Sequence, residues 1–125
     1  MRLPFLAGHR LFKVLQWGDY GAANIEENSD LSQADIVASE VRAVDGLTGK
    51  HMVMFDVDIP MTVVPSSTSG HNHVYFHTYV SREAFFRLLD ELANCGVVEP
   101  GYCSASKARG FAALRLPWVK KPGVE

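Results

Sequence analysis

The chain has 125 residues, of which 47% are hydrophobic and 21% are charged, and its formal net charge is −2. These values are typical of a globular protein, argue against a disordered chain, and argue against indiscriminate coating of nucleic acid. We therefore expect a single domain over residues 1–125, with residues 120–125 forming a frayed tail.

Membrane and redox features lead us to expect a cytoplasmic protein. No apolar run approaches the roughly 20 residues that cross a bilayer, and we recognise no signal peptide. The two cysteines, Cys95 and Cys103, lack the spacing of a zinc site. We expect reduced thiols and no membrane partner.

Charge is distributed unevenly along the chain. Acidic residues gather between Asp19 and Asp58, whereas the C-terminal quarter is basic, with Lys107, Arg109, Arg115, Lys120 and Lys121. Such a chain can hold a metal at one place and a phosphate backbone at another. A solvated surface of mixed sign explains the same pattern equally well.

The N-terminal part predicts extended structure broken by a long loop. Residues 10–17 fit a strand or a short helix, and the Gly-rich turn after them favours the strand. The polar, acidic residues 22–34 predict a loop that can also serve as an interaction loop. Residues 36–44 alternate and are rich in β-branched side chains, which predicts a strand, with a helix over residues 35–42 as the alternative.

A second strand is expected after the turn at residues 45–50. Asp45-Gly46 is a hairpin signal, and residues 53–58 alternate between apolar and other side chains. These features predict an antiparallel pair formed by residues 36–44 and 53–58. Residues 61–64 lie between Pro60 and Pro65 and predict an edge strand or an extended connector.

The C-terminal half predicts one principal helix. Residues 81–94 begin at Ser81, a good N-cap, and Gly96 fits a left-handed stop. An apolar stripe at helical spacing predicts the core face that packs on the sheet, made by Phe85, Leu88, Leu89 and Leu92. Strands are expected at residues 73–80 and 111–116, a short strand or an extended exit from the helix at 97–99, and a helical turn at 104–109. The fold class is therefore α+β, with a mainly antiparallel sheet and this helix on one face.

The candidate site centres on two carboxylates. In a strand over residues 53–58, Asp56 and Asp58 share one face and can converge on Mg²⁺ or Mn²⁺. His73 lies on the polar side of the next predicted strand, so it can form a small cluster with the two carboxylates if the strands are neighbours. The turn made by Ser67, Thr68, Ser69 and Gly70 can cradle a phosphate, and Arg115 can neutralise its charge.

Simpler interpretations of these residues remain open. An Asp-x-Asp pair on the solvated face of an antiparallel sheet needs no ligand, and a single His near a turn is usually a surface or core group. His71 and His77 could instead extend the site into a His-rich transition-metal centre.

The motif order carries a family resemblance. The motifs are Asp56-x-Asp58, a Ser/Thr-x-Gly70-x-x-His73 turn, and a terminal Leu-Arg115-Leu-Pro segment. Together they resemble the catalytic core of archaeo-eukaryotic primases and primase-polymerases, and the same segments are similar to small proteins encoded by actinobacterial phages. The resemblance implies carboxylates that hold divalent metal, a His that contacts nucleotide phosphate, and a nucleotide or nucleic acid as partner.

Two other functions fit the residues. A non-catalytic phage protein could bind and inhibit or redirect a host protein through the acidic residues 26–30 or through exposed Trp17, Tyr20 and Trp118. A nucleic-acid binder could use Tyr75 and Tyr79 on an open sheet face, with the basic C-terminal segment following the phosphates.

Overall fold

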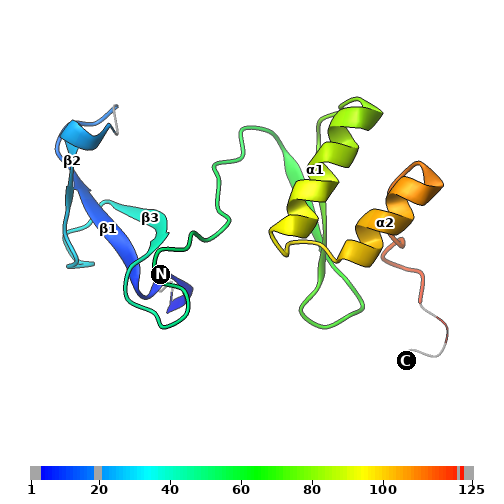
Figure 1. Ribbon diagram of the computed structural model, residues 1–125, viewed down its shortest axis with the longest axis horizontal. Helices are drawn as coiled ribbons and strands as arrows, with labels where there is room; N and C mark the ends of the chain where they lie inside the picture. Colours follow the sequence, from blue (N-terminus) through cyan, green and yellow to red (C-terminus); the bar gives the residue numbers. More distant parts are fainter. Residues whose placement is uncertain (1–3, 19–20, 121, 123–125) are drawn as a thin grey trace. The chain divides into compact units, whose positions relative to one another are not determined.

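The computed structural model describes residues 4–18, 21–120 and 122. The chain divides into two compact units, Met1–Phe55 and Asp56–Glu125, and Figure 1 draws strands β1 to β3 in the first unit and the two helices in the second. The single domain expected over residues 1–125 stays a prediction. Of the predicted tail, only Lys120 and Pro122 lie within the described residues.

The Met1–Phe55 unit is built on an antiparallel sheet with the strand order β2-β1-β3. The strands are β1 (His9–Val14), β2 (Ile25–Glu27) and β3 (Ile36–Val41), with short 3-10 helices at Pro4–Leu6 and Ala22–Asn24. Val14 of β1 and Val41 of β3 are buried. The strand predicted at 10–17 is confirmed in β1, and β3 is a strand rather than the alternative helix. The predicted loop at 22–34 is wrong in part, because it contains β2.

The strand predicted at residues 53–58 does not form, and residues 52–58 are irregular. The predicted partner segment forms β3 and pairs instead with β1, with Leu11 opposite Val37. Beyond the turn, an isolated bridge joins Glu40 to His51, and the Met52 amide donates to the Ser39 carbonyl at 2.9 Å. A strand needs a neighbour for its backbone groups, and among the described residues 53–58 joins no ladder.

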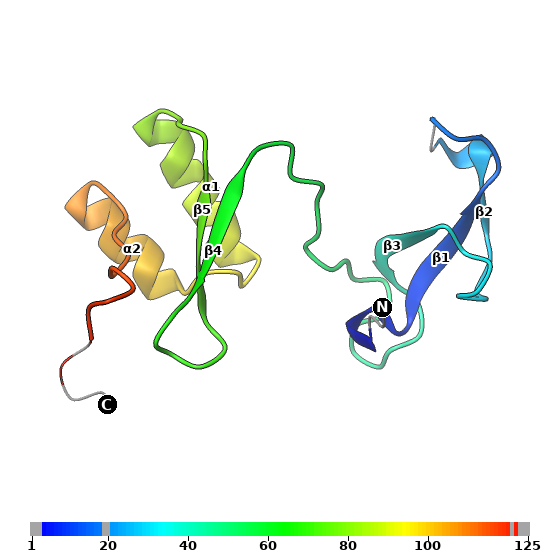
Figure 2. The same cartoon turned by 180° about the vertical axis from the view of Figure 1, so that it is seen from behind.

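A two-stranded hairpin opens the Asp56–Glu125 unit. Strand β4 (Met61–Pro65) pairs antiparallel with β5 (Asn72–Phe76), from Met61 opposite Phe76 to Pro65 opposite Asn72, as Figure 2 shows. The edge strand predicted between the two prolines is therefore confirmed. The strand predicted at 73–80 is too long, because β5 ends at Phe76. The His77 amide still donates to the Pro60 carbonyl at 2.9 Å, but the Thr78 amide turns back to the Phe76 carbonyl at 2.7 Å.

The principal helix α1 spans Arg82–Asn94, and the Ser81 hydroxyl accepts a hydrogen bond from the Ala84 amide. Gly96 follows in the left-handed conformation, with φ of 77°. Both ends therefore match the prediction. A second helix, α2 (Pro100–Arg109), begins four residues earlier than the expected turn. Proline suits the first helical position because its missing N–H would have no partner there. The residues before it, 97–99, form no strand, so the prediction of a strand there is wrong.

The core of this unit lies between the helices. Leu89 of α1 is 4% exposed and Cys103 of α2 is also buried, whereas Leu88 is 50% exposed. The prediction that Leu88 belongs to the core is therefore wrong, because α1 buries only part of its apolar stripe. The strand predicted at 111–116 is also wrong, since these residues are irregular.

Antiparallel sheets and two helices, of which α1 is the longer, confirm the α+β class. Cys95 and Cys103 are free thiols, as predicted. In the part of the chain that the structure describes, neither helix is long and apolar enough to cross a membrane.

Candidate functional site

The turn between β4 and β5 is closed by hydrogen bonds of its own backbone. The Ser66 amide donates to the His71 carbonyl at 3.0 Å, and the His71 amide donates to the Thr68 carbonyl at 3.0 Å. The Ser66 hydroxyl accepts from the Thr68 amide at 3.2 Å. Gly70 has φ of 80°, a conformation that side chains resist and glycine adopts freely.

The predicted phosphate-binding residues form the exposed tip of this turn. Ser67, Thr68, Ser69 and Gly70 are all exposed. Within the described residues, the amides of Ser67, Ser69 and Gly70 donate no hydrogen bond to the protein. Successive unengaged amides in a turn, with hydroxyl groups beside them, can bind an anion.

Arg115 reaches this turn from the irregular segment after α2. Its Nη2 donates a hydrogen bond to the Ser67 hydroxyl, and its side chain is half-buried. Among the residues described, Arg115 forms no ion pair. The structure thus brings together two of the residues that the sequence assigned to one phosphate site, although Arg115 does not come from a strand.

The two carboxylates and the imidazole do not gather at one place. Asp56 and Asp58 are exposed in the irregular segment before β4. His73 lies on β5 opposite Val64, three residues, or about 10 Å of strand, beyond the start of β4 at Met61. Among the described residues, no three His, Cys, Asp or Glu side chains form a group that could hold a metal.

The other two histidines of this unit also stand apart. His71 is exposed in the turn, while His77 Nε2 and Thr62 Oγ1 share a hydrogen bond of 2.8 Å. Binding of Mg²⁺ or Mn²⁺ by Asp56 and Asp58 therefore stays a prediction, and such an ion would need further oxygen ligands from a substrate or water.

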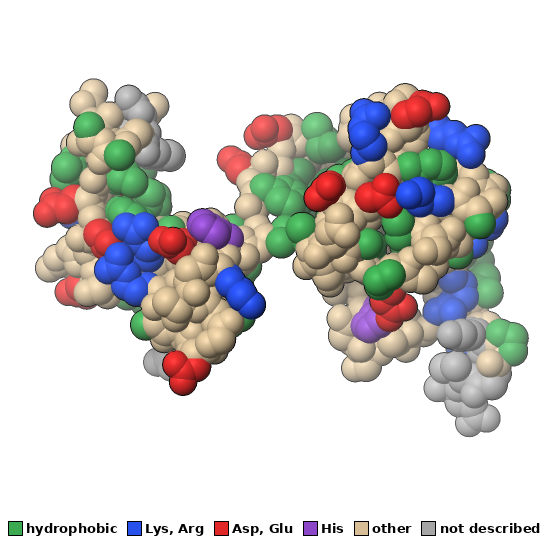
Figure 3. All heavy atoms as spheres, viewed as in Figure 1, with side chains coloured by type: hydrophobic (Ala, Val, Ile, Leu, Met, Phe, Trp, Pro, Cys, Tyr) green, Lys and Arg blue, Asp and Glu red, His purple; other side chains and the backbone are tan. Residues whose placement is uncertain are grey.

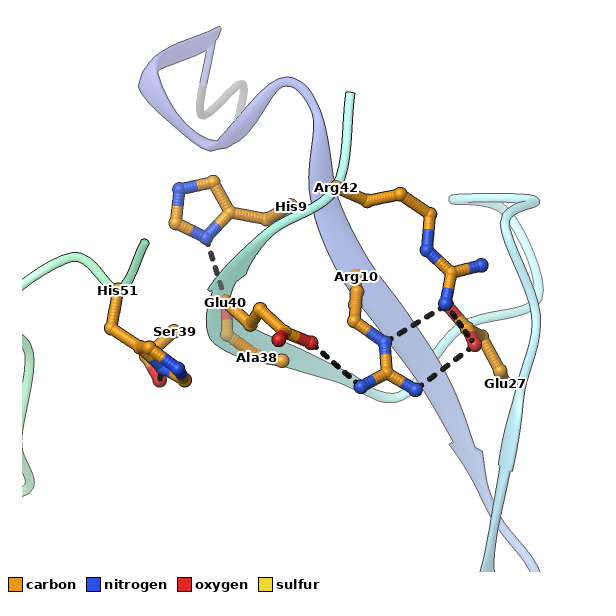
Figure 4. Close-up of polar contacts among 8 residues, drawn as sticks. All are labelled: His9, Arg10, Glu27, Ala38, Ser39, Glu40, Arg42 and His51. Atoms are coloured by element: carbon orange, nitrogen blue, oxygen red, sulfur yellow. Dashed lines mark hydrogen bonds and ion pairs between the residues drawn. The ribbon is translucent and has the colours of Figure 1, made fainter. Parts of the chain in front are cut away.

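A polar network in the other unit was missed by the sequence analysis (Figure 4). Arg10 of β1 donates to both carboxylate oxygens of Glu27 on β2, at 3.1 and 3.2 Å, and to Glu40 on β3 at 2.7 Å. Arg42 adds a contact of 2.9 Å to Glu27. The hydrogen bonds from Arg10 hold the pKa of Glu27 and the pKa of Glu40 below their usual range.

This network joins all three strands of the sheet. The Arg10 guanidinium also lies 4.9 Å from the centre of the Phe12 ring, and Figure 4 shows its three contacts pointing at the flanking carboxylates. Because each guanidinium of the network already faces a carboxylate, we assign it to stability rather than to ligand binding. Only the strand register could have revealed it, since Arg10 lies 17 residues from Glu27 and 30 residues from Glu40 in the sequence.

Surface charge is mixed over the Asp56–Glu125 unit. On the face drawn in Figure 3, Lys and Arg side chains alternate with Asp and Glu, and hydrophobic side chains are visible between them. No family model, curated protein or solved structure matches the chain.

Proposed function

We propose that the protein binds a phosphate group of a nucleotide or nucleic acid at the β4–β5 turn. The contact between Arg115 and Ser67 carries this proposal. A guanidinium recognises phosphate through paired, charge-assisted hydrogen bonds. The Arg115 guanidinium lies beside the exposed hydroxyls and the unengaged amides of the turn. A cationic donor and several neutral donors can therefore bind the same anion.

The neighbours of Arg115 favour an anion over a structural role. A guanidinium committed to the fold would face a carboxylate, as Arg10 faces Glu27, whereas Arg115 has only a neutral hydroxyl partner among the described residues. Its half-burial limits its motion. We propose binding alone, with no catalytic step at Asp56, Asp58 or His73.

Thermal unfolding with and without ligand tests this function. Pyrophosphate or a nucleoside triphosphate at 100 times its Kd should stabilise the folded chain by about 2.7 kcal/mol. Arg115→Ala and Ser67→Ala should lower the rise in Tm, while Arg87→Ala, an exposed arginine of α1, serves as the matched control. A rise that is the same in all four proteins would contradict the proposal.

Divalent metal is tested in the same assay. If Asp56 and Asp58 hold Mn²⁺ together with a triphosphate, Mn²⁺ should add a further rise in Tm that the Asp56→Asn, Asp58→Asn double variant lacks. A rise that survives in the double variant would remove these carboxylates from the metal site.

One observation favours a protein partner as a second candidate. Paired residues of a hairpin share a face, and one face of β4–β5 exposes a row of apolar side chains, each 41–48% exposed: Met61, Val63, Val74 and Phe76. Exposed apolar patches often mark partner sites, and both outer edges of a two-stranded sheet can accept a further strand.

This second function predicts binding of a host protein to that face. The Val63→Asp, Val74→Asp double variant should lose a host protein that the unmutated chain retains from a lysate. Thr62→Asp, on the opposite face, is the control. Equal retention by the double variant and the control would contradict this candidate.

A further inference from the structure

A cavity of about 340 Å³ lies in the Asp56–Glu125 unit, away from the residues assigned to the phosphate site. Three segments line it: the connection from β5 to α1, the first turns of α1, and residues 110–112. The side chains that matter for its chemistry are Tyr79, Arg82, Phe86 and Phe111. Its volume falls in the range of small-ligand sites, roughly 300–1,000 Å³.

Two guanidiniums lie over aromatic rings that line this cavity, and of the two only Arg82 is itself a lining residue. Arg82 is 5.3 Å from the centre of the Phe86 ring, and Arg109 is 5.4 Å from that of Phe111. Arg109 Nε also donates to the Phe111 carbonyl at 3.2 Å. Within the described residues, neither arginine forms an ion pair, so both retain charge for an anion.

Gly110 lies at the wall of this cavity in a backbone conformation that favours glycine. Its φ is 93°, and a Cβ there would lie 3.8 Å from Arg82 Nη2, which is an ordinary van der Waals contact. Another residue would therefore be strained by its backbone and not by the guanidinium. Arg82 itself is exposed at the wall of the cavity.

Aromatic rings are available to a planar ligand. Tyr79 is fully exposed and Phe111 is 59% exposed, although both line the cavity. Large exposed rings beside unpaired arginines are the combination on which nucleic-acid bases stack, because every base offers a π-face. An apolar side chain from a protein partner would leave the guanidiniums of Arg82 and Arg109 without an anionic partner.

The cavity and the phosphate site share one stretch of chain. Phe111 and Arg115 are four residues apart, a span of at most about 14 Å. Arg109 and Arg115 lie at the two ends of this stretch, and no acidic residue lies between them. A ligand with several phosphates can therefore follow this segment from the cavity to the β4–β5 turn.

We infer that the cavity receives a base of a single-stranded nucleic acid whose backbone phosphate rests on the turn, an inference that depends on the proposed function. Tyr79 and Phe111 stack on the base, and Arg82 and Arg109 contact the adjoining phosphates. The ligand class is thereby narrowed from any phosphate to an unpaired strand with accessible bases.

Fluorescence anisotropy with two labelled oligomers of equal length tests this inference on the full chain. One is an oligothymidylate, and the other is abasic, so that it keeps the phosphates and lacks the bases. We expect the oligothymidylate to bind more tightly, by about 5- to 150-fold for each stacked base. Tyr79→Ala with Phe111→Ala should reduce its affinity to that of the abasic oligomer, whereas Phe111→Trp, which keeps a ring, should preserve the preference.

Failures of the two proposals give different results. Equal affinity for both oligomers, unchanged by loss of the rings, would overturn the base site while leaving the phosphate site intact. Affinities that are unchanged by Arg115→Ala, or no binding of either oligomer, would overturn the phosphate site and with it the strand ligand. Circular dichroism of each variant verifies that it is folded.

Discussion

Replacement of Leu89 by alanine should destabilise the Asp56–Glu125 unit far more than the same change at Leu88. Leu89 is 4% exposed, so its truncation removes buried methyl groups and leaves a cavity, at a cost of about 2–5 kcal/mol. Leu88 is 50% exposed. Its truncation loses about half of the burial and opens no enclosed space, so we expect about 1 kcal/mol or less.

Urea unfolding followed by the helical circular dichroism signal measures both changes, because both helices belong to this unit. Leu89→Ala should lower the free energy of unfolding by at least about 2 kcal/mol. In a thermal melt of a domain of this size, the same loss should lower the Tm by at least about 8 °C. Equal losses, or a larger loss for Leu88→Ala, would refute the orientation of α1. The cavity lined by Arg82 and Phe86 would then have no support.

Three further outcomes are expected. Ser81→Ala removes the N-cap of α1 and should cost about 1 kcal/mol in urea unfolding, whereas no loss would show that the cap is not formed. The hydrogen bond from Arg10 lowers the pKa of Glu27 from 4.5, so the stability it adds is complete above pH 4.5 and is lost as the pH falls further. In Arg10→Gln, the free energy of unfolding should therefore decline less between pH 4.5 and lower pH. Identical curves of unfolding free energy against pH for the two proteins would contradict the network. Burial raises the pKa of Cys103 while Cys95 is exposed, so a thiol reagent should modify Cys95 first, and faster labelling of Cys103 would be inconsistent with the packing of α2.

Local signals in the sequence were sufficient for α1 and for the β4–β5 turn. Ser81 and Gly96 mark the helix because capping depends on a few neighbouring residues. The Ser/Thr/Gly segment marks the turn because its chemistry is equally local. The start of α2 at Pro100 was not predicted, although proline in the first turn can begin a helix.

Pairing and burial could not be predicted in the same way. Residues 53–58 have the alternation of a strand, but β3 pairs with β1 instead, and a single sequence does not show which segments pair. The apolar stripe on α1 identifies a face but not how much of it is covered, so Leu88 was assigned to the core although it is half-exposed.

The candidate site was also predicted only in part. Ser67 and Arg115 could be assigned to one anion because both side chains can donate hydrogen bonds to a phosphate, and the structure places them in contact. The cavity beside Phe111 was missed because its walls come from three separate segments. The sequence holds one clue, since Arg82 and Arg109 each lie close in sequence to a phenylalanine.

Amide chemical shifts of the ¹⁵N-labelled chain test the central claim most directly. On titration with pyrophosphate, we predict saturable shifts of the Ser67, Ser69 and Gly70 amides and of the Arg115 side-chain Nε–H, and their loss in Arg115→Ala. Shifts that are absent from these groups, or that persist unchanged in Arg115→Ala, would contradict phosphate binding at the β4–β5 turn.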